Sequence, residues 1–337
     1  MAFREETSLR LKPQQAEFGP DLPADPMERL VHFARLAPSS HNSQPWKFVL
    51  ERDAIDVFAD LTRGLAVADR EQRELYISLG CAIESLLIAA DYEGFGSEAR
   101  LFPVAGDESY ACRVEIRRAG PKRDNAAAAL LHAAPGRHTS HRPFDRARTV
   151  AARDLDWLRS AADGDAVALH FLGEGERGAL EALLGRYEAI LFSDAGYREE
   201  LGRWIGEGAL GTPWLLSKLG QFALAQLNVN ERLAKADAGR LASAPHLALL
   251  STRADGRADQ VRAGQAYLRI ALMAETRGIR TQPFSPPLEL ADARAETSRL
   301  FGIGGRHAQH LFRLGYAEAE TVRTGRRPLS EILVRAA

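Results

Sequence analysis

The sequence predicts an α+β fold made of two tandem, diverged halves, one near residues 1–132 and the other near 133–337. A chain of 337 residues is long for one domain and suits two. Both halves combine stretches with the apolar spacing of helices and stretches with the alternation of strands. One helical segment of the first half also recurs in the second half.

The repeated segment begins at Gly80 (GCAIESLLIAADYEGFG) and again at Gly264 (GQAYLRIALMAETRGIR). The two copies align without a gap, and helix, loop and strand patterns follow in the same order around each copy. The identical residues are the pairs Gly80 and Gly264, Ala82 and Ala266, Ala90 and Ala274, and Gly94 and Gly278. The repeat therefore predicts one corresponding long helix in each half.

The elements of the first half follow from its periodicity and its helix-ending residues. Residues 27–37 have apolar residues at helical spacing, and Pro38 ends that helix. Residues 46–60 alternate like a hairpin, and residues 70–94 carry a long apolar stripe with Gly94 as a C-cap. We expect a strand pair around 110–117 and an alanine-rich helix over 125–134.

The second half is read in the same way. Helices are expected over 153–162, 176–192, 196–206 and 260–278, with a last helix near 304–313. Strands are expected over 166–172 and 245–252, and a turn over 281–287.

Composition excludes several classes of protein. Forty-four Lys and Arg residues balance 45 Asp and Glu residues, so no general charge favours nucleic acid or an anionic membrane. The only cysteines, Cys81 and Cys112, build neither a disulfide framework nor a four-cysteine metal site. The N-terminus lacks a signal-peptide core, and the longest apolar stretch, 209–229, is interrupted by Pro213 and Lys218. We therefore expect a cytoplasmic protein.

Two polar motifs indicate where a ligand binds. The first, APSSHNSQPWKF (37–48), places small polar groups after a helix end, which suits a flat polar ligand such as a flavin. The second, RHTSHRPF (137–144), gathers cations and hydroxyls that suit a phosphate. Taken alone, they also fit an ordinary capped loop and a solvated basic turn. The candidate binding residues are Pro38, Ser39, Ser40, Asn42, Arg137, His138, Thr139, Ser140, His141 and Arg142.

Both motifs resemble those of the nitroreductase-like FMN-binding superfamily, in particular its Acg-type branch, in which two such halves are fused. The resemblance implies that the 37–48 loop approaches an FMN held mainly by the other half. It also implies that the segment from Arg137 grips the FMN phosphate. The spacing departs by one residue from the common form, so either His141 or Arg142 supplies the last cation.

The resemblance extends to three further segments. A basic residue before the terminal proline completes the phosphate site in the family, and Arg326 matches it. A backbone N–H after the repeat helix reaches flavin N5 in the family. Here Ser285 has such an N–H, whereas the two prolines after it have none. Arg240 resembles the family's cation near flavin N1 and the C2 carbonyl. The further candidate residues are Arg240, Pro283, Phe284, Ser285 and Arg326.

The two halves divide these motifs between them. The first half has the 37–48 loop but nothing like residues 137–142, and the second half reads RSAADGDAVAL (159–169) where its own loop would fall. A fused pair that derives from a symmetric dimer can lose one of two equivalent sites in this way. We therefore expect one FMN per chain and an intramolecular pseudo-dimer that closes the site as a monomer.

The predicted function is an FMN-dependent oxidoreductase that moves hydride from NAD(P)H to FMN N5 and then to a small oxidised acceptor. No catalytic side chain is assigned. The alternatives are a flavin-sequestering protein without turnover, closed by a lid over 196–240, and a sister activity such as flavin fragmentation or reductive dehalogenation. The sequence does not name the substrate or choose between NADH and NADPH.

Three other sites are disfavoured. GEGERG (173–178) fits a dinucleotide-binding glycine pattern, but Glu174 and Glu176 would repel a pyrophosphate. His138 with His141, and His307 with His310, have helical spacing but no third metal ligand. No Gly-X-Ser-X-Gly segment indicates an α/β-hydrolase.

Overall fold

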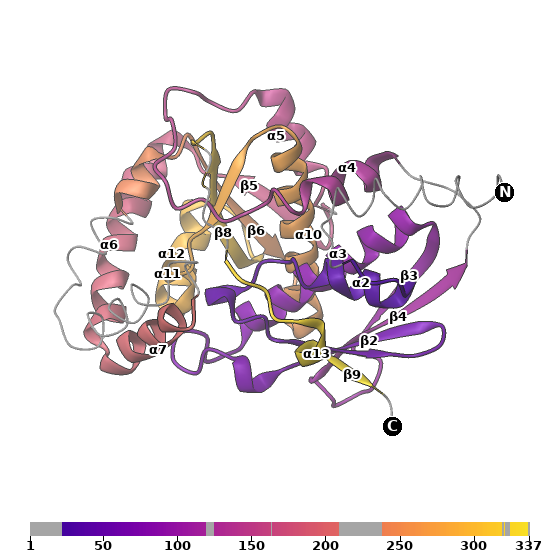
Figure 1. Cartoon of the computed structure of the whole chain (residues 1–337). Helices are drawn as coiled ribbons and strands as arrows, with labels where there is room; N and C mark the ends of the chain where they lie inside the picture. The colour runs from indigo at the N-terminus through magenta and orange to yellow at the C-terminus, as the bar shows by residue number, and fades with distance from the viewer. Residues whose placement is uncertain are drawn as a thin grey trace.

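The structure is a computed structural model that describes residues 22–118, 125–162, 164–208, 238–318, 320 and 324–335. It confirms the α+β class, with two separate sheets and helices between and around them (Figure 1). The first sheet has the order β3-β4-β2-β1-β9 and the second the order β5-β6-β8-β7. The strands are β1 (Trp46–Leu50), β2 (Ala54–Ala59), β3 (Phe95–Leu101), β4 (Tyr110–Arg118), β5 (Val167–Phe171), β6 (His246–Thr252), β7 (Arg280–Pro283), β8 (His307–Gly315) and β9 (Leu333–Arg335).

The two sheets share one topology. In the first, β1 pairs with β2, β2 with β4, and β4 with β3, all antiparallel; β5, β6, β8 and β7 repeat this arrangement. Both sheets also carry a bulge at the same place. The β2–β4 register skips Ala111, and the β6–β8 register skips Gln309. Bulges are conserved features of a fold, so this match supports the correspondence between the halves.

The repeated segments form the two long central helices, α3 (Arg73–Glu93) and α10 (Arg257–Thr276) (Figure 1). They pack against each other at their matching glycines. A Cβ on Gly80 would overlap the carbonyl oxygen of Val261, and a Cβ on Gly264 would overlap that of Ile77. Only glycine permits so close an approach of two helix backbones.

The ends of the helices follow the expected chemistry. α2 (Pro26–Ala34) begins with a proline at N1, and the Asp25 carboxylate accepts the N–H of Glu28. Gly94 ends α3 in the left-handed region, at φ 81°, as predicted. The other helices are α4 (Asn125–Ala133), α5 (Ala152–Arg159), α6 (Arg177–Ser193), α7 (Ala195–Gly206), α11 (Pro286–Glu289), α12 (Ala291–Leu300) and α13 (Leu329–Ile332), with 3-10 turns η1 (Ser40–Asn42), η2 (Leu61–Arg63) and η3 (Glu174–Glu176).

Two expectations for the second half are wrong. The predicted helix near 304–313 is strand β8, and the predicted turn over 281–287 contains strand β7 and the start of α11. Every residue of β8 after His307 is buried, because both faces of this strand are covered. A strand buried on both faces shows no alternation, so periodicity does not distinguish it from a buried helix.

The C-terminal segment returns to the first sheet. β9 runs parallel to β1, with Phe48 opposite Leu333 and Leu50 opposite Arg335. This crossing places residues 324–335 beside the first half, although they follow the second half in the sequence.

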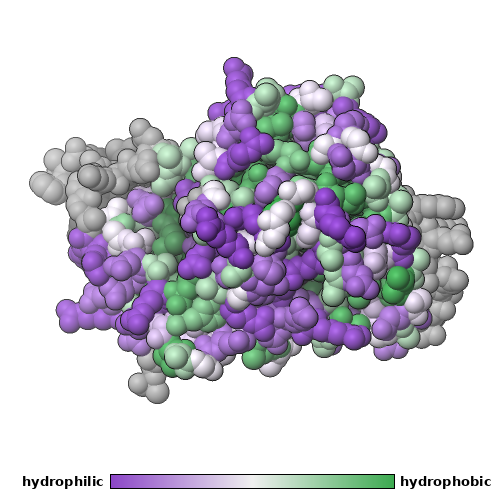
Figure 2. Space-filling view, turned by 180° about the vertical axis from the view of Figure 1, so that it is seen from behind, coloured by the Kyte–Doolittle hydropathy of each residue, from purple (hydrophilic) through white to green (hydrophobic). Residues whose placement is uncertain are grey.

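Most large apolar side chains lie inside, and the face shown in Figure 2 is largely hydrophilic with scattered hydrophobic groups. Within the described part of the chain, α3 is the one helix long and apolar enough to cross a membrane. Because 89% of that stretch is buried in the fold, α3 is a core helix here.

Candidate functional site

A cavity of about 860 Å³ lies where the two halves meet. It is bordered by the loop after α2, the segment after α4, the turn after β7 and the segment before α13. With Arg240 from the segment before β6, the structure thus brings together most of the predicted binding residues from five distant parts of the sequence. Those that line the cavity are Pro38, Ser39, Ser40, Asn42, Arg137, His138, Thr139, His141, Arg240, Pro283, Phe284, Ser285 and Arg326.

Two predicted residues do not line the cavity. The Ser140 hydroxyl donates to the Glu320 carboxylate at 3.0 Å, and Arg142 pairs with Glu318 at 3.1 Å. Of the two candidates for the last cation, His141 borders the cavity, and Arg142 extends toward solvent.

The first-half loop is held in a tight, strained turn. His41 and Asn42 have φ of 49° and 52°, a region that non-glycine residues seldom occupy. The Ser39 hydroxyl accepts the N–H of Gln44 at 2.9 Å, and the Ser40 hydroxyl donates to the Glu74 carboxylate. Such strain is typical of loops shaped for a ligand.

One end of the cavity is strongly basic. Arg137 is buried, and Arg326 donates to Asn42 Oδ1 at 3.1 Å and to the Leu36 carbonyl at 3.2 Å. Burial first, and then the charges of Arg137 and Arg35, lower the pKa of Arg326 to about 9. Three guanidinium groups therefore repel one another at this end, and a phosphate would relieve that repulsion.

Arg35 was not among the predicted residues. It follows the last turn of α2, and the only sequence signal was a cation shortly before the Pro-Ser-Ser loop. Its Nη1 also donates to the Arg327 carbonyl at 3.4 Å, which joins α2 to the C-terminal segment.

The second-half segments are tied together beside this basic end. Thr139 forms an isolated parallel bridge with Thr281, and the Ser140 N–H donates to the Thr281 carbonyl at 3.2 Å. Arg240 Nε donates to the carbonyl of His141 at 3.0 Å. The predicted phosphate segment, the turn after β7 and Arg240 thus form one connected wall.

The opposite end of the cavity is acidic, and sequence reasoning missed it entirely. Its carboxyl groups are Glu74 from α3, Glu188 from α6 and Glu289 from α11, with Tyr197 and His310 beside them. No motif joins these residues in the sequence; packing alone assembles them.

The pKa values of Glu74 and Glu289 are shifted in opposite directions. Burial works to raise the pKa of Glu74, but the charge of Arg73 and hydrogen bonds from Ser285 and Ser40 hold it below its usual range. Burial, together with the charge of Glu74, raises the pKa of Glu289 well above its usual range. Burial lowers the pKa of His310 to about 4.

Helix α7 covers part of the cavity with a helical stripe of Tyr197, Leu201 and Ile205. Its Glu200 carboxylate accepts the backbone N–H groups of Val67 and Ala68, which fastens α7 to the first half. Of the predicted lid over 196–240, residues 209–237 lie outside the described residues.

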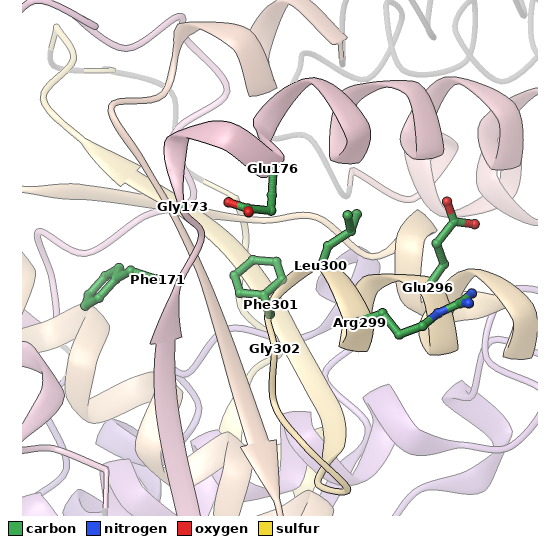
Figure 3. A pocket seen from close by; sticks show the side chains of 8 residues that line it. All are labelled: Phe171, Gly173, Glu176, Glu296, Arg299, Leu300, Phe301 and Gly302. Carbon is green, nitrogen blue, oxygen red and sulfur yellow. The ribbon is translucent and has the colours of Figure 1, made fainter.

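A separate, open hollow lies at the glycine-rich pattern 173–178 (Figure 3). A Cβ on Gly173 would meet the Glu176 carboxylate, so an acid lies against the loop that would have to receive a phosphate. Arg299 and Glu296 of α12 border the same hollow (Figure 3). This arrangement does not suit a dinucleotide, as the sequence predicted.

Two other chemistries find no support in the described residues. Within the described ranges no group of three His, Cys, Asp or Glu side chains is placed to hold a metal ion. Both cysteines are buried free thiols, and burial raises the pKa of each to about 12.

No protein-family profile matches the chain. The "Putative NAD(P)H nitroreductase Rv3131" of Mycobacterium tuberculosis is 27% identical over 327 residues, covering 92% of this chain and 91% of the relative. The "Putative NAD(P)H nitroreductase acg" of the same organism is 27% identical over 334 residues, covering 91% and 95%. A crystal structure described as a putative nitroreductase from Anabaena variabilis shares the fold, with a TM-score of 0.53 at 10% identity over 84% of this chain and 82% of that one. The chain is thus similar, over nearly its whole length, to proteins described as putative NAD(P)H nitroreductases.

Proposed function

We propose that this protein is an FMN-dependent oxidoreductase that takes hydride from NAD(P)H and passes it to a small oxidised acceptor. One observation carries the proposal: the strained 38–42 loop and the basic end at Arg137 and Arg326 open into a single cavity. The cavity combines a site for a phosphate with small polar groups for a flat ring. The names of the sequence relatives support a nicotinamide as the reductant.

The residues present fit FMN. The mutually repelling arginines favour a bound phosphate, with Arg137 and Arg326 as its ligands. Ser39, Ser40 and Ser285 would orient the ring from both halves, and Arg240 would favour negative charge near N1. When bound, FMN supplies the hydride-accepting and hydride-donating centre, and the protein supplies binding, orientation and access.

The proposed architecture is an intramolecular pseudo-dimer with one site. It is supported by the shared strand order, the matching bulges and the reciprocal contacts of Gly80 and Gly264. In an isologous interface, a contact from i to j is accompanied by one from j to i. The first half would extend over 1–132 with residues 324–335 added, and the second over the rest of 133–337.

A flavin-sequestering protein without turnover is the second candidate. The observation that favours it is the apolar stripe of α7 over the cavity, with Tyr197, Leu201 and Ile205 facing inward. Such a cover would keep a nicotinamide from the ring.

Anaerobic addition of NADH or NADPH to the purified protein separates these candidates. We expect a yellow protein that carries one FMN per chain and loses its colour with at least one of the two nucleotides. Flavin that is bound but never bleached would support sequestration. A protein that takes up no FMN would refute both candidates, and two FMN per chain would refute the single-site architecture.

A further inference from the structure

A second cavity, of about 560 Å³, lies behind the acidic end of the first. It is bounded by the loop before α3, by the junction of α6 and α7, by α11 and α12, and by the start of β8. Among the described residues, Tyr197 and Glu289 alone line both cavities. Their side chains therefore form the partition between the two spaces.

The partition consists of a hydroxyl and a carboxyl group, both of which can donate and accept a proton. The Tyr197 hydroxyl donates a hydrogen bond to the Glu289 carboxyl, and Tyr197 is almost fully buried. Within the part of the chain described, Glu289 Oε2 has no hydrogen-bond partner. Glu289 still keeps some accessible surface, which is the surface that borders the cavities.

The charges that act on Glu289 are two carboxylates, Glu74 and Asp69, and one guanidinium, Arg73. Burial and the charge of Glu74 favour its protonated form, and Asp69 adds to this; Arg73 opposes them. We therefore expect Glu289 to hold a proton at neutral pH. The titratable groups that face this region are Asp69 from the loop before α3, Arg73 and Glu74 at the start of α3, Glu188 from α6, Tyr197 from α7, Arg294 from α12 and His310 from β8.

The second cavity is polar and reaches solvent. Arg70 at its rim has 72% of its side chain exposed, and His307 has 46%. Asp69 lies on its wall, where burial and the charge of Glu74 raise its pKa to about 6, near neutral pH. Its other polar lining includes Glu71, Asp194, Arg294 and Arg306.

We propose that Glu289, supported by Tyr197, is the proton-relay residue of this site and passes protons from the second cavity to the acceptor in the first. The inference rests on the proposed function. It requires only that reduction of the acceptor consumes a proton together with the hydride.

The step balances with the nicotinamide as reductant. The acceptor gains a hydride, whose two electrons come from the nicotinamide that is oxidised, and one proton from Glu289, whose O–H bond breaks to leave a carboxylate. A proton from the second cavity then restores the acid. The repulsion from Glu74 drives this return, because two carboxylates in one buried site disfavour double ionisation.

The first test needs no flavin. An infrared spectrum of the protein without FMN should contain the C=O stretch of a protonated carboxylic acid at neutral pH, and Glu289→Gln should remove that band in a difference spectrum. Tyr197→Phe should shift the band, because it removes the hydrogen bond. A difference spectrum with no carboxylic-acid band would overturn the proposal.

The second test uses the FMN-loaded protein and separates the two half-reactions. Glu289→Gln should keep its FMN and its rate of bleaching by the nicotinamide, but its reoxidation by a quinone should slow at least ~10-fold, since general acids contribute about 10²–10⁴-fold. The loss should depend on pH and show a larger solvent isotope effect. The control is Glu174→Gln, which alters an exposed acid that lines neither of the two cavities.

The outcomes distinguish a failure of the proton relay from a failure of the proposed oxidoreductase function. Unchanged quinone kinetics in both Glu289→Gln and Tyr197→Phe would overturn the relay and leave the oxidoreductase proposal standing. Wild-type protein that never bleaches would overturn the proposed function, and the infrared band would still report on the partition.

Discussion

The two halves of the molecule have the same framework and different chemistry. Both central helices begin at an arginine, Arg73 in α3 and Arg257 in α10, and each lies on a four-stranded antiparallel unit with the same order and the same bulge. The cavity, however, is lined by Glu74, Ile77, Ser78 and Cys81 of α3 and, among the described residues of α10, by Tyr267 alone. The two sheets and central helices thus match in arrangement, whereas the polar residues beside them differ.

The divergence is visible at matching positions of the repeat. Where α3 presents Glu74, Ser78 and Cys81 to the cavity, α10 has Ala258, Arg262 and Gln265. Arg262 pairs with Asp259 at 3.6 Å, and Gln265 donates to Glu84 at 3.5 Å, so these groups satisfy each other. The packing of α3 on α10 depends on glycines at their contact, whereas the chemistry of the cavity depends on a few polar side chains of α3.

The largest expected effect tests the basic end of the cavity. Arg137→Ala combined with Arg326→Ala should weaken FMN binding by about 10²–10⁴-fold, because each charge-assisted bond contributes roughly 1.5–3 kcal/mol. Fluorescence titration of the apoprotein with FMN measures this directly. Arg142→Ala is the matched control, since Arg142 pairs with Glu318 outside the cavity. Full FMN content in the double variant would show that the phosphate is held elsewhere.

The next effect tests whether the halves are equivalent at their contact. Gly80→Ala and Gly264→Ala should each lower the free energy of unfolding by about 1–3 kcal/mol or more, because the new methyl group meets a helix carbonyl that cannot swing aside. Thermal unfolding of the two variants should show similar losses.

Gly185→Ala in α6 is the control for the glycine pair. No atom lies near its added Cβ, so the substitution should be neutral or stabilise by about 0.5–1 kcal/mol. A large loss for Gly80→Ala with none for Gly264→Ala would break the correspondence between the helices.

Local patterns were sufficient for much of the framework and for the basic end of the site. The apolar stripe of α3, its Gly94 cap and the hairpin at 46–60 are properties of short windows, and the structure confirms them. Each loop predicted to bind FMN comes from a motif that is continuous in the sequence, and the structure places both loops at one cavity. Strand β8 was missed because burial on both faces removes its alternation.

The acidic end shows a different limit. Glu74, Tyr197 and Glu289 come from α3, α7 and α11, and each alone looks like an ordinary polar residue of a helix. Their common role depends on how the halves pack, and in particular on α7 being fastened across the junction by Glu200. Arg35 was missed for a related reason, since only the return of residues 324–335 places Arg326 beside it.

The smallest effect concerns an ion pair that both halves retain with opposite polarity. In the first half, Arg29 of α2 binds Glu93 at the end of α3 through two bonds, at 3.0 and 2.9 Å. In the second half, Asp154 of α5 binds Arg277, which occupies the position of Glu93 in the repeat. Each pair fastens a flanking helix to a central one, and the signs of the two charges are reversed between the halves.

Double-mutant cycles should give a coupling energy of about 1 kcal/mol for Arg29 with Glu93, whose side chains are only 17% and 12% exposed. The coupling of Asp154 with Arg277 should be weaker, about 0.5 kcal/mol, and should fall faster with salt, because Arg277 is 40% exposed. The decisive variant reverses the first pair to copy the second, as Arg29→Asp with Glu93→Arg. If the halves are equivalent here, this double change should recover most of the stability that either single change loses. If the protein with the reversed pair is no more stable than the less stable single variant, the residues around α2 and α5 are not equivalent, just as the polar residues of α3 and α10 are not.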